Sequence, residues 1–161
     1  MPRRMLATDR GTFIDLAQRG VTGSMKHWLV KSEPDAFSWD QQVANGVEPW
    51  TGVRNHTAKL NLKAMRKGDQ AFFYHSNEGK EIVGVVEVVR EAYPDPTAES
   101  GDWVCVDMKA VAPMPKPVTL VVIKADPKLA DMALVRQSRL SVMPISKPHW
   151  DRVCRMGGWN S

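Results

Sequence analysis

The β-forming runs of this 161-residue chain are short, and most are followed within a few residues by proline or glycine. The run at residues 26–31 ends at Ser-Glu-Pro, and the run at residues 140–143 ends at Pro144. Short helical patterns lie between the runs, without the regular strand–helix alternation of a parallel α/β sheet. This pattern predicts an α+β domain built around a small bent sheet or barrel.

Two helices are predicted in the first half of the chain. Ser38 and Gln41 have the spacing of a capping box, in which two side chains bind free backbone N–H groups, so a short helix is expected over residues 39–44. Apolar residues recur every three or four positions over residues 55–66, with lysine and arginine between them, which predicts a second, amphipathic helix.

The middle of the chain is predicted to form antiparallel β-structure. Residues 70–76 and 82–89 are rich in aromatic and β-branched side chains and are separated by a turn, so they should form a hairpin. A loop is expected over residues 93–102 and a further strand over residues 103–108. The three prolines at alternate positions from 113 to 117 are expected to prevent a continuous ladder after that strand.

The last part of the chain mixes helical and β signals. Residues 118–130 combine a Val-Val-Ile run with helix-capping residues, and we expect short helices there rather than a strand. Residues 140–144 predict a last strand. Ser146 should then begin a terminal helix, which Gly157 and Gly158 end.

A glycine-rich connector at residues 20–24 precedes the first strongly patterned segment. We therefore expect a flexible N-terminal extension over residues 1–24 and a folded domain over residues 25–161. A docked helix around residues 13–17 and a natural start of the protein at Met25 both remain open alternatives.

The net charge of the chain is small. Twenty-two lysine and arginine residues stand against eighteen aspartate and glutamate residues, which gives a net charge of +4, and half of this excess lies in residues 1–24. A protein that binds polyanions mainly by releasing counterions carries a denser basic face. Any nucleic-acid partner must therefore be recognised largely through a pocket.

Membrane and secreted proteins are not expected. No apolar stretch approaches the roughly 20 residues of a membrane helix, and charged residues interrupt the start of the chain, where a signal peptide needs an apolar region. The two cysteines, Cys105 and Cys154, are too few for a disulfide framework and indicate a reducing compartment. The expectation is a cytoplasmic protein with no membrane partner.

Common enzyme and cofactor motifs are absent from the sequence. It has no nucleophile elbow, no phosphate-binding glycine-rich loop and no dinucleotide fingerprint. The four histidines are dispersed, and none has a second histidine or cysteine at metal-ligand spacing. We therefore expect no catalytic residue, no metal site and no cofactor.

Polar and aromatic residues gather at predicted strand ends and turns, where bonding groups can face outward. Glycine lets a ligand approach the backbone, while tryptophan, arginine and asparagine offer a stacking face and hydrogen-bond donors. Each of these segments also has a purely structural explanation, since Trp50 can be a core residue and Asn55 a helix cap. The segments are residues 31–34, 50–55, 74–76 and 139–142.

Five motifs in this order and spacing resemble the EVE domain family. They are Lys-His-Trp-Leu-Val-Lys-Ser-Glu-Pro at 26–34, Trp-Thr-Gly-Val-Arg-Asn at 50–55, Phe-Phe-Tyr-His-Ser at 72–76, Glu-Ala-Tyr-Pro-Asp at 91–95 and Arg-Leu-Ser-Val at 139–142. The resemblance covers residues 26 to about 156 and is shared with the C-terminal domain of thymocyte nuclear proteins. It implies a PUA-like fold, a bent β-barrel with peripheral short helices, in agreement with the α+β class inferred above.

The resemblance also implies a non-enzymatic domain that recognises a modified base, such as methylated or oxidised cytosine, displaced from DNA, with RNA as the less favoured partner. A displaced base needs an aromatic face, polar groups for its Watson–Crick edge and an apolar niche for a methyl group. Stacking is assigned to Trp50 and Tyr74, and the apolar niche to Val53 and Leu140. The other candidates are Ser32, Glu33, Asn55, His75 and Ser141 for edge reading, Lys31, Arg54 and Arg139 for a phosphate or for closing the pocket, and Ser76 beside them.

Two other functions remain open from the sequence. An enzyme acting on modified RNA or nucleotides could use Glu33 or His75 as a general base if both lie in one pocket. A protein-interaction module would instead present a contiguous apolar surface patch.

Overall fold

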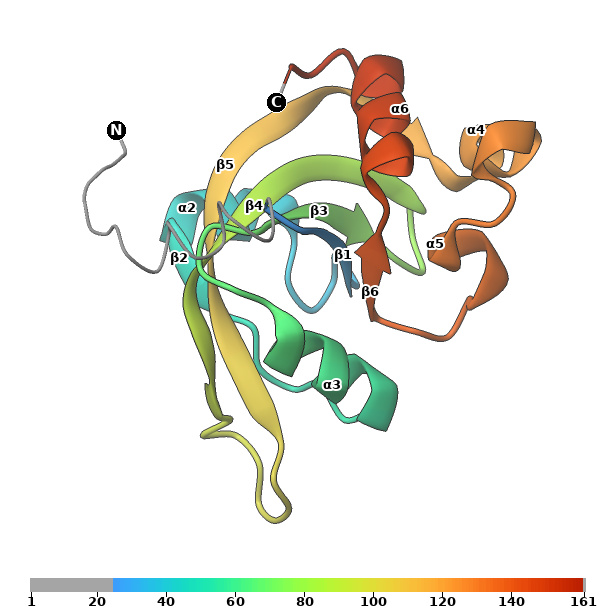
Figure 1. Cartoon of the computed structure of the whole chain (residues 1–161). Helices are drawn as coiled ribbons and strands as arrows, with labels where there is room; N and C mark the ends of the chain where they lie inside the picture. The colour runs from blue at the N-terminus through green and yellow to red at the C-terminus, as the bar shows by residue number, and fades with distance from the viewer. Residues whose placement is uncertain (1–24, 161) are drawn as a thin grey trace.

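The structure, a computed structural model, describes residues 25–160, and the expected N-terminal extension at residues 1–24 lies outside these residues. One mixed sheet forms the centre of the described chain, and helices pack around it (Figure 1). The strands are β1 (His27–Ser32), β2 (Val47–Pro49), β3 (Gln70–His75), β4 (Glu81–Pro94), β5 (Val104–Thr119) and β6 (Val142–Ile145). The helices are α2 (Trp39–Asn45), α3 (His56–Ala64), α4 (Leu120–Ala125), α5 (Ala133–Arg136) and α6 (Lys147–Gly157), with a 3-10 helix, η2 (Pro127–Leu129).

The expected α+β class is confirmed, but the sheet is open. Its strand order is β2-β5-β4-β3-β1-β6, and β1 is parallel to β3 while the other neighbouring strands are antiparallel. Within residues 25–160, no pairing joins the end strands β2 and β6. The strands therefore do not close into the expected barrel, although bulges in the β4–β5 pairing bend these two strands into a long curved ribbon (Figure 1).

The β4–β5 ribbon is longer than the sequence predicts. β4 continues into the residues expected to form a loop, and β5 runs through the proline-rich segment. The ladder is nevertheless interrupted at the prolines, because Gly84 pairs with Pro113 whereas Ile82 pairs with Val118. The extra residues on β5 lie in this irregularity, where a missing N–H donor disrupts no regular pairing.

The helix-capping signals are confirmed. The side chains of Ser38 and Gln41 form a capping box at α2, and the side chain of Asn55 accepts a hydrogen bond from the backbone of α3. Ser146 caps α6, and Gly158 ends it in the left-handed conformation. Of residues 118–130, expected to be helical, residues 120–129 contain α4 and η2, while residues 118 and 119 end β5. β2 and α5 were not predicted, because three or four residues carry too little periodicity.

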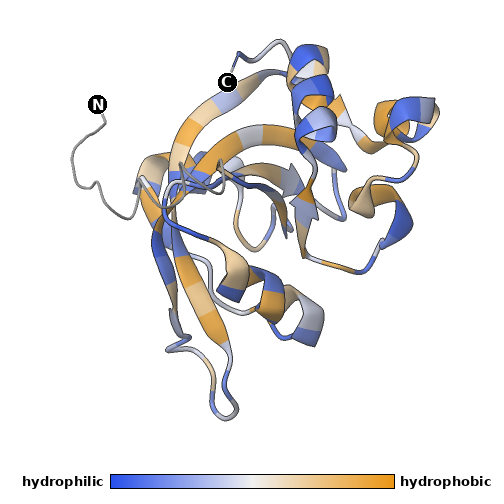
Figure 2. Cartoon of the chain, in the orientation of Figure 1, coloured by the Kyte–Doolittle hydropathy of each residue, from blue (hydrophilic) through white to orange (hydrophobic). Residues whose placement is uncertain are grey.

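Two consecutive phenylalanines on β3 pack against opposite layers of the core. Phe72 stacks on Trp150 of α6, with ring centroids 3.8 Å apart, and both side chains are fully buried. Phe73 meets Trp39 of α2 at 5.3 Å and Trp50 at 5.5 Å, in both cases edge to face. Apolar residues are accordingly concentrated along the strands, while polar residues cover much of α6 (Figure 2).

The ring of Trp39 lies directly over Gly84 of β4. A Cβ at Gly84 would lie 2.5 Å from ring atoms of Trp39, closer than carbon atoms can approach without displacement. Gly84 also pairs with Phe73, so the indole cannot move away from β4 without disturbing the aromatic packing. Glycine is required here for space and not for backbone conformation.

We predict that Gly84→Ala lowers the free energy of unfolding by about 1–3 kcal/mol, the usual cost of overpacking a core. Val121→Ala is the control, because that side chain is 77% exposed and its loss should change stability by no more than about 0.5 kcal/mol. Urea unfolding of both variants measures the difference. Equal stabilities would show that Trp39 can move freely.

Candidate functional site

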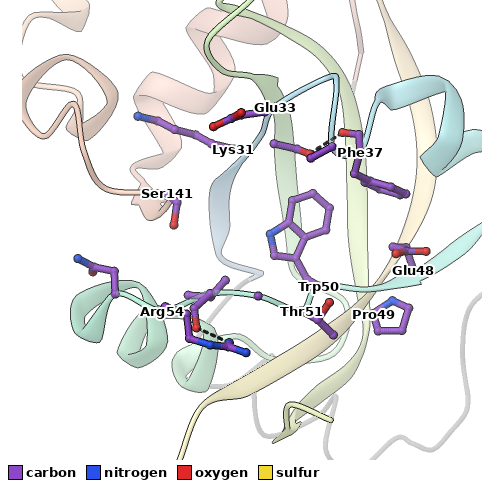
Figure 3. A pocket seen from close by; sticks show the side chains of 14 residues that line it. Lys31, Glu33, Phe37, Glu48, Pro49, Trp50, Thr51, Arg54 and Ser141 are labelled. Carbon is purple, nitrogen blue, oxygen red and sulfur yellow. Dashed lines mark hydrogen bonds between the residues drawn. The ribbon is translucent and has the colours of Figure 1, made fainter. Parts of the chain in front are cut away.

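A cavity of about 570 Å³ lies beside the carboxyl end of β1. Its walls come from the turn after β1, from β2 and the segment that follows it, and from the loop before β6 (Figure 3). The lining residues are Lys31, Ser32, Glu33, Ala36, Phe37, Glu48, Pro49, Trp50, Thr51, Gly52, Val53, Arg54, Asn55 and Ser141.

The cavity brings together three of the four segments singled out in the sequence. The predicted residues that line it are Lys31, Ser32, Glu33, Trp50, Val53, Arg54, Asn55 and Ser141. The predicted residues that do not line it are Tyr74, His75, Ser76, Arg139 and Leu140. The end of β3 therefore does not contribute to the lining, while segment 139–142 contributes only Ser141.

The residues at the end of β3 have other contacts. Tyr74 is 3% exposed, and the ammonium group of Lys31 lies 5.9 Å from the centre of its ring. The Nε2 atom of His75 accepts a hydrogen bond from the backbone N–H of Trp39 at 3.1 Å, at the start of α2. Burial lowers the pKa of His75, which favours the neutral imidazole that this acceptor role needs.

Trp50 forms a rigid wall of the cavity. Its side chain lines the cavity although the residue is only 7% exposed, and Phe37 contacts the indole edge to face at 6.1 Å. The backbone N–H of Trp50 donates to the carbonyl oxygen of Val106 at 2.7 Å, which fixes the main chain against β5. Trp50 thus belongs to the hydrophobic core and also lines the cavity, while its role in stacking on a base stays a prediction.

The opposite wall is tied across the end of β1. The backbone N–H of Lys31 donates to the carbonyl oxygen of Ser141 at 2.9 Å, and the Lys31 ammonium donates to the carbonyl oxygen of Ser138 at 2.8 Å. Burial lowers the pKa of Lys31. The turn after β1 is closed by hydrogen bonds from the backbone N–H groups of Ala36 and Phe37 to the carbonyl oxygen of Glu33, each 2.9 Å long.

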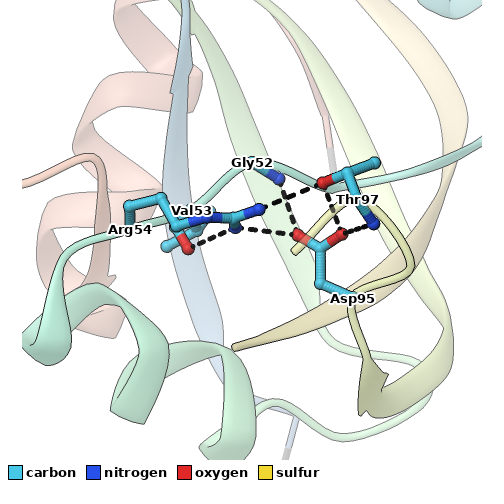
Figure 4. Close-up of polar contacts among 5 residues, drawn as sticks. All are labelled: Gly52, Val53, Arg54, Asp95 and Thr97. Atoms are coloured by element: carbon cyan, nitrogen blue, oxygen red, sulfur yellow. Dashed lines mark hydrogen bonds and ion pairs between the residues drawn. The ribbon is translucent and has the colours of Figure 1, made fainter. Parts of the chain in front are cut away.

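A buried carboxylate fixes the segment that carries Gly52 and Arg54. The Oδ2 atom of Asp95 accepts from the Gly52 N–H at 2.8 Å and from Arg54 Nη1 at 3.0 Å, while Oδ1 accepts from the N–H and the hydroxyl of Thr97 at 2.7 Å each (Figure 4). Arg54 also donates to the carbonyl oxygen of Val53 and to the Thr97 hydroxyl. The Asp95 side chain has no exposed surface, whereas the Arg54 side chain is 39% exposed.

These hydrogen bonds decide the charge of Asp95. Burial alone would raise its pKa, but the hydrogen bonds from Thr97, the Gly52 N–H and Arg54 outweigh burial and lower the pKa to about 2. The carboxylate is therefore ionised at neutral pH and matched to the guanidinium of Arg54. Arg54 was expected to hold a phosphate or close the pocket, yet the structure uses three of its hydrogen bonds within the protein.

Several lining residues were not foreseen from the sequence. Phe37, Glu48 and Thr51 lie in turns or in the short β2 strand, where no periodic pattern marks them. Asp95 was quoted within a motif but given no role. The Asp-Pro-Thr sequence is typical of an Asx turn, which the contacts to Thr97 confirm, but nothing local indicates the partner at Gly52, 43 residues earlier.

A cluster of metal ligands, a membrane-spanning helix and a pair of general bases in one cavity are not found among the described residues. Between residues 25 and 160, no group of three or more histidine, cysteine, aspartate or glutamate side chains is placed to hold a metal ion. No helix in this range is long and apolar enough to span a membrane. Glu33 lines the cavity but His75 does not, so the two candidate general bases are not brought together.

We predict that the contribution of Asp95 to stability is lost in acid. Its pKa of about 2 in the folded protein lies below its ordinary 3.8, so the unfolded chain takes up the proton first as the pH falls. The contribution is complete above about pH 4 and disappears as the pH falls through about 2. In urea unfolding at a series of pH values, the stability difference between wild type and Asp95→Asn should shrink over this window. A difference independent of pH would contradict the hydrogen-bond geometry.

Comparison with known proteins places this geometry in a family. The model of the EVE domain matches residues 26–156. Thymocyte nuclear protein 1 from Gallus gallus is 37% identical over 161 aligned positions, which cover 79% of this chain and 66% of the chicken protein. The chain thus spans slightly less than two thirds of that relative.

Solved structures show the same fold. Rpa0253 from Rhodopseudomonas palustris is 64% identical with a TM-score of 0.79, and the match covers 83% of this chain and 94% of that one. Human THYN1, solved in complex with 5-methylcytosine-containing DNA, is 30% identical with a TM-score of 0.77 over 84% of this chain and 99% of that one. A YTH domain from Zygosaccharomyces rouxii, 16% identical with a TM-score of 0.53, shares the fold alone.

The expected cytoplasmic location is contradicted by these comparisons, because the curated relatives are named as nuclear proteins. The cysteine content could not have made this distinction, since cytosol and nucleus both keep thiols reduced. None of the relatives described above is named as an enzyme, and human THYN1 was solved with DNA. The match over residues 26–156, supported by 37% identity to a curated relative, shows that this chain belongs to the EVE domain family.

Proposed function

We propose that the cavity binds a modified base of DNA, such as methylated or oxidised cytosine, after the base has left the double helix, and that no reaction follows. The strongest support is the composition of the cavity wall, which joins a fixed aromatic side to polar groups on the opposite side. An extrahelical base needs both, because its ring is held by stacking and apolar contact while its edge is read by hydrogen bonds. Human THYN1 adds support as a relative solved with 5-methylcytosine-containing DNA.

The aromatic side of the cavity consists of Trp50 and Phe37, which brace each other edge to face. Val53, 7% exposed, adds apolar surface next to them. This is the kind of surface that can accept the added methyl group of a modified pyrimidine. Because these side chains are packed against the core, the wall keeps its shape without a ligand, and little conformational entropy is lost on binding.

The polar side of the cavity offers acceptors and donors to the edge of a base. Glu33 is exposed and lines the cavity, and Ser141 lines it from the loop before β6, across from Trp50 (Figure 3). Glu33 can accept from an exocyclic amino group such as that of cytosine, and a serine hydroxyl can either donate or accept. The volume of about 570 Å³ lies within the range of small-ligand sites.

The charge distribution supports recognition through the base rather than through the backbone of DNA. Lys31 and Arg54, the two cationic residues of the cavity, are both engaged by oxygen atoms of the protein. Arg139 is exposed outside the cavity and is the better candidate for a phosphate contact. With few free cations at the site, few counterions are released on binding, so affinity should depend weakly on salt.

The proposal is tested by binding measurements on matched oligonucleotides. Duplex DNA, single-stranded DNA and RNA of one sequence, each with cytosine, 5-methylcytosine or an oxidised cytosine at one position, are titrated by fluorescence anisotropy. Tighter binding to a modified DNA is expected. Equal affinity for all the oligonucleotides would overturn the proposal, and a preference confined to RNA would replace DNA with RNA as the partner.

We predict that Ser141→Leu abolishes this preference by filling the cavity. The side chain is half-buried at the cavity wall, so leucine should occupy space meant for the base while unfolding free energy changes by no more than about 0.5 kcal/mol. The affinity for the modified oligonucleotide should fall by roughly tenfold or more, equivalent to at least about 1.4 kcal/mol.

Ser138→Leu is the matched control. Ser138 lies in the same loop, is exposed and does not line the cavity, and its contact with Lys31 uses the backbone carbonyl, which the substitution keeps. Its affinity should equal that of wild type. Unchanged binding by folded Ser141→Leu would mean that the base is held elsewhere.

A further inference from the structure

Asp95 does not line the cavity, yet it holds the cavity wall at Gly52. Gly52 has a φ of +86°, and a Cβ built on it would meet no atom within 4 Å. The backbone here is therefore not fixed by side-chain contact on that side. Two backbone N–H groups of this segment donate to distant parts of the chain, that of Trp50 to Val106 and that of Gly52 to Asp95.

The same carboxylate determines the direction of the Arg54 side chain. The guanidinium donates to Asp95 and to the Thr97 hydroxyl, which is itself bonded to Asp95. The guanidinium carbon also lies 5.8 Å from the ring centre of Trp103, in the strand-connecting loop that follows Thr97. Arg54 thus points along the cavity wall towards the β4–β5 connection. Without these contacts its side chain, which is 39% exposed, could reach the phosphates of a bound nucleic acid.

We propose that Asp95 is a positioning residue that sets specificity, because its carboxylate fixes the Gly52–Arg54 wall and keeps the Arg54 charge from binding phosphates without regard to the base. The inference rests on the proposed function of the cavity. It adds that selectivity for a modified base is produced partly by a buried anion that never touches the base. Removing this anion should weaken modified-base binding and strengthen binding to nucleic acid in general.

Asp95→Asn tests both parts of this inference. An amide keeps the size of the side chain but offers one oxygen in place of two and no charge, so it cannot satisfy four donors. We expect the affinity for duplex DNA with one methylated or oxidised cytosine to fall roughly tenfold, because hydrogen bonds to a charged group are lost. Affinity for the unmodified duplex should rise, and its salt dependence should increase by roughly one released counterion.

Asp126→Asn is the matched control. Asp126 pairs with Arg152 at 2.7 Å and accepts from the backbone N–H of Lys128, so it combines an arginine contact with a backbone contact as Asp95 does. It is not among the residues of the cavity. Its substitution should leave both affinities and the salt dependence unchanged.

Arg54→Lys provides a second variant that does not disturb the buried carboxylate as strongly. Lysine keeps the positive charge but cannot make the forked contact to Asp95 and Thr97. If positioning matters, this variant also loses discrimination between modified and unmodified DNA. If Arg54 were only a phosphate contact, lysine would preserve discrimination, and the inference would be overturned.

The outcomes separate this inference from the proposed function. Wild type that binds modified and unmodified DNA equally overturns the proposed function, and the inference with it. Wild-type discrimination that survives in folded Asp95→Asn overturns the inference alone. Thermal unfolding of each variant establishes that it is folded, and if Asp95→Asn does not fold, Arg54→Lys decides the question.

Discussion

The alternation of Phe72 and Phe73 on β3 is the constraint on which the rest of the structure depends. Consecutive strand residues point to opposite faces of a sheet, and both faces are buried here. One ring anchors α6 through Trp150, and the other anchors α2 and the cavity wall through Trp39 and Trp50. A shift of one residue in the β3 register would exchange the two layers, so the position of the cavity is coupled to the pairing of the central strands.

This coupling explains why the aromatic wall is a poor place to separate binding from folding. Trp50 is in contact with Phe37 and Phe73, and truncating a buried tryptophan typically costs about 3–5 kcal/mol. A change in Trp50 therefore alters stability together with the cavity. Ser141 is more informative, because it lines the cavity and is only half-buried, whereas a change in the buried Asp95 needs its stability measured beside binding.

Interactions between residues close in the sequence predict most of the helices and strands, whereas features that depend on long-range pairing could not be predicted. The Ser38–Gln41 capping box and the Asn55 cap depend on neighbours within one helical turn, so both could be inferred correctly. The length of the β4–β5 ribbon could not, since prolines in β5 are tolerated only where the register shifts. The family motifs correctly predicted that segments 31–33 and 50–55 lie beside one cavity. The Gly52–Asp95 contact could not be predicted, because it depends on how two distant loops meet in the folded chain.

The parallel pairing of β1 with β3 has a consequence for how such a cavity can change over time. Parallel neighbours cannot be joined by a tight turn, so the chain leaves β1 and returns to β3 through a long crossover connection. Most of the cavity lining, from Glu33 to Asn55, belongs to this connection and not to β1 or β3, and of these residues Glu48 and Pro49 lie on β2, which pairs with β5. Substitutions in one continuous stretch can thus reshape the lining while the hydrogen-bonded ladder stays intact, which lets descendants of one scaffold diverge in the ligand they accept.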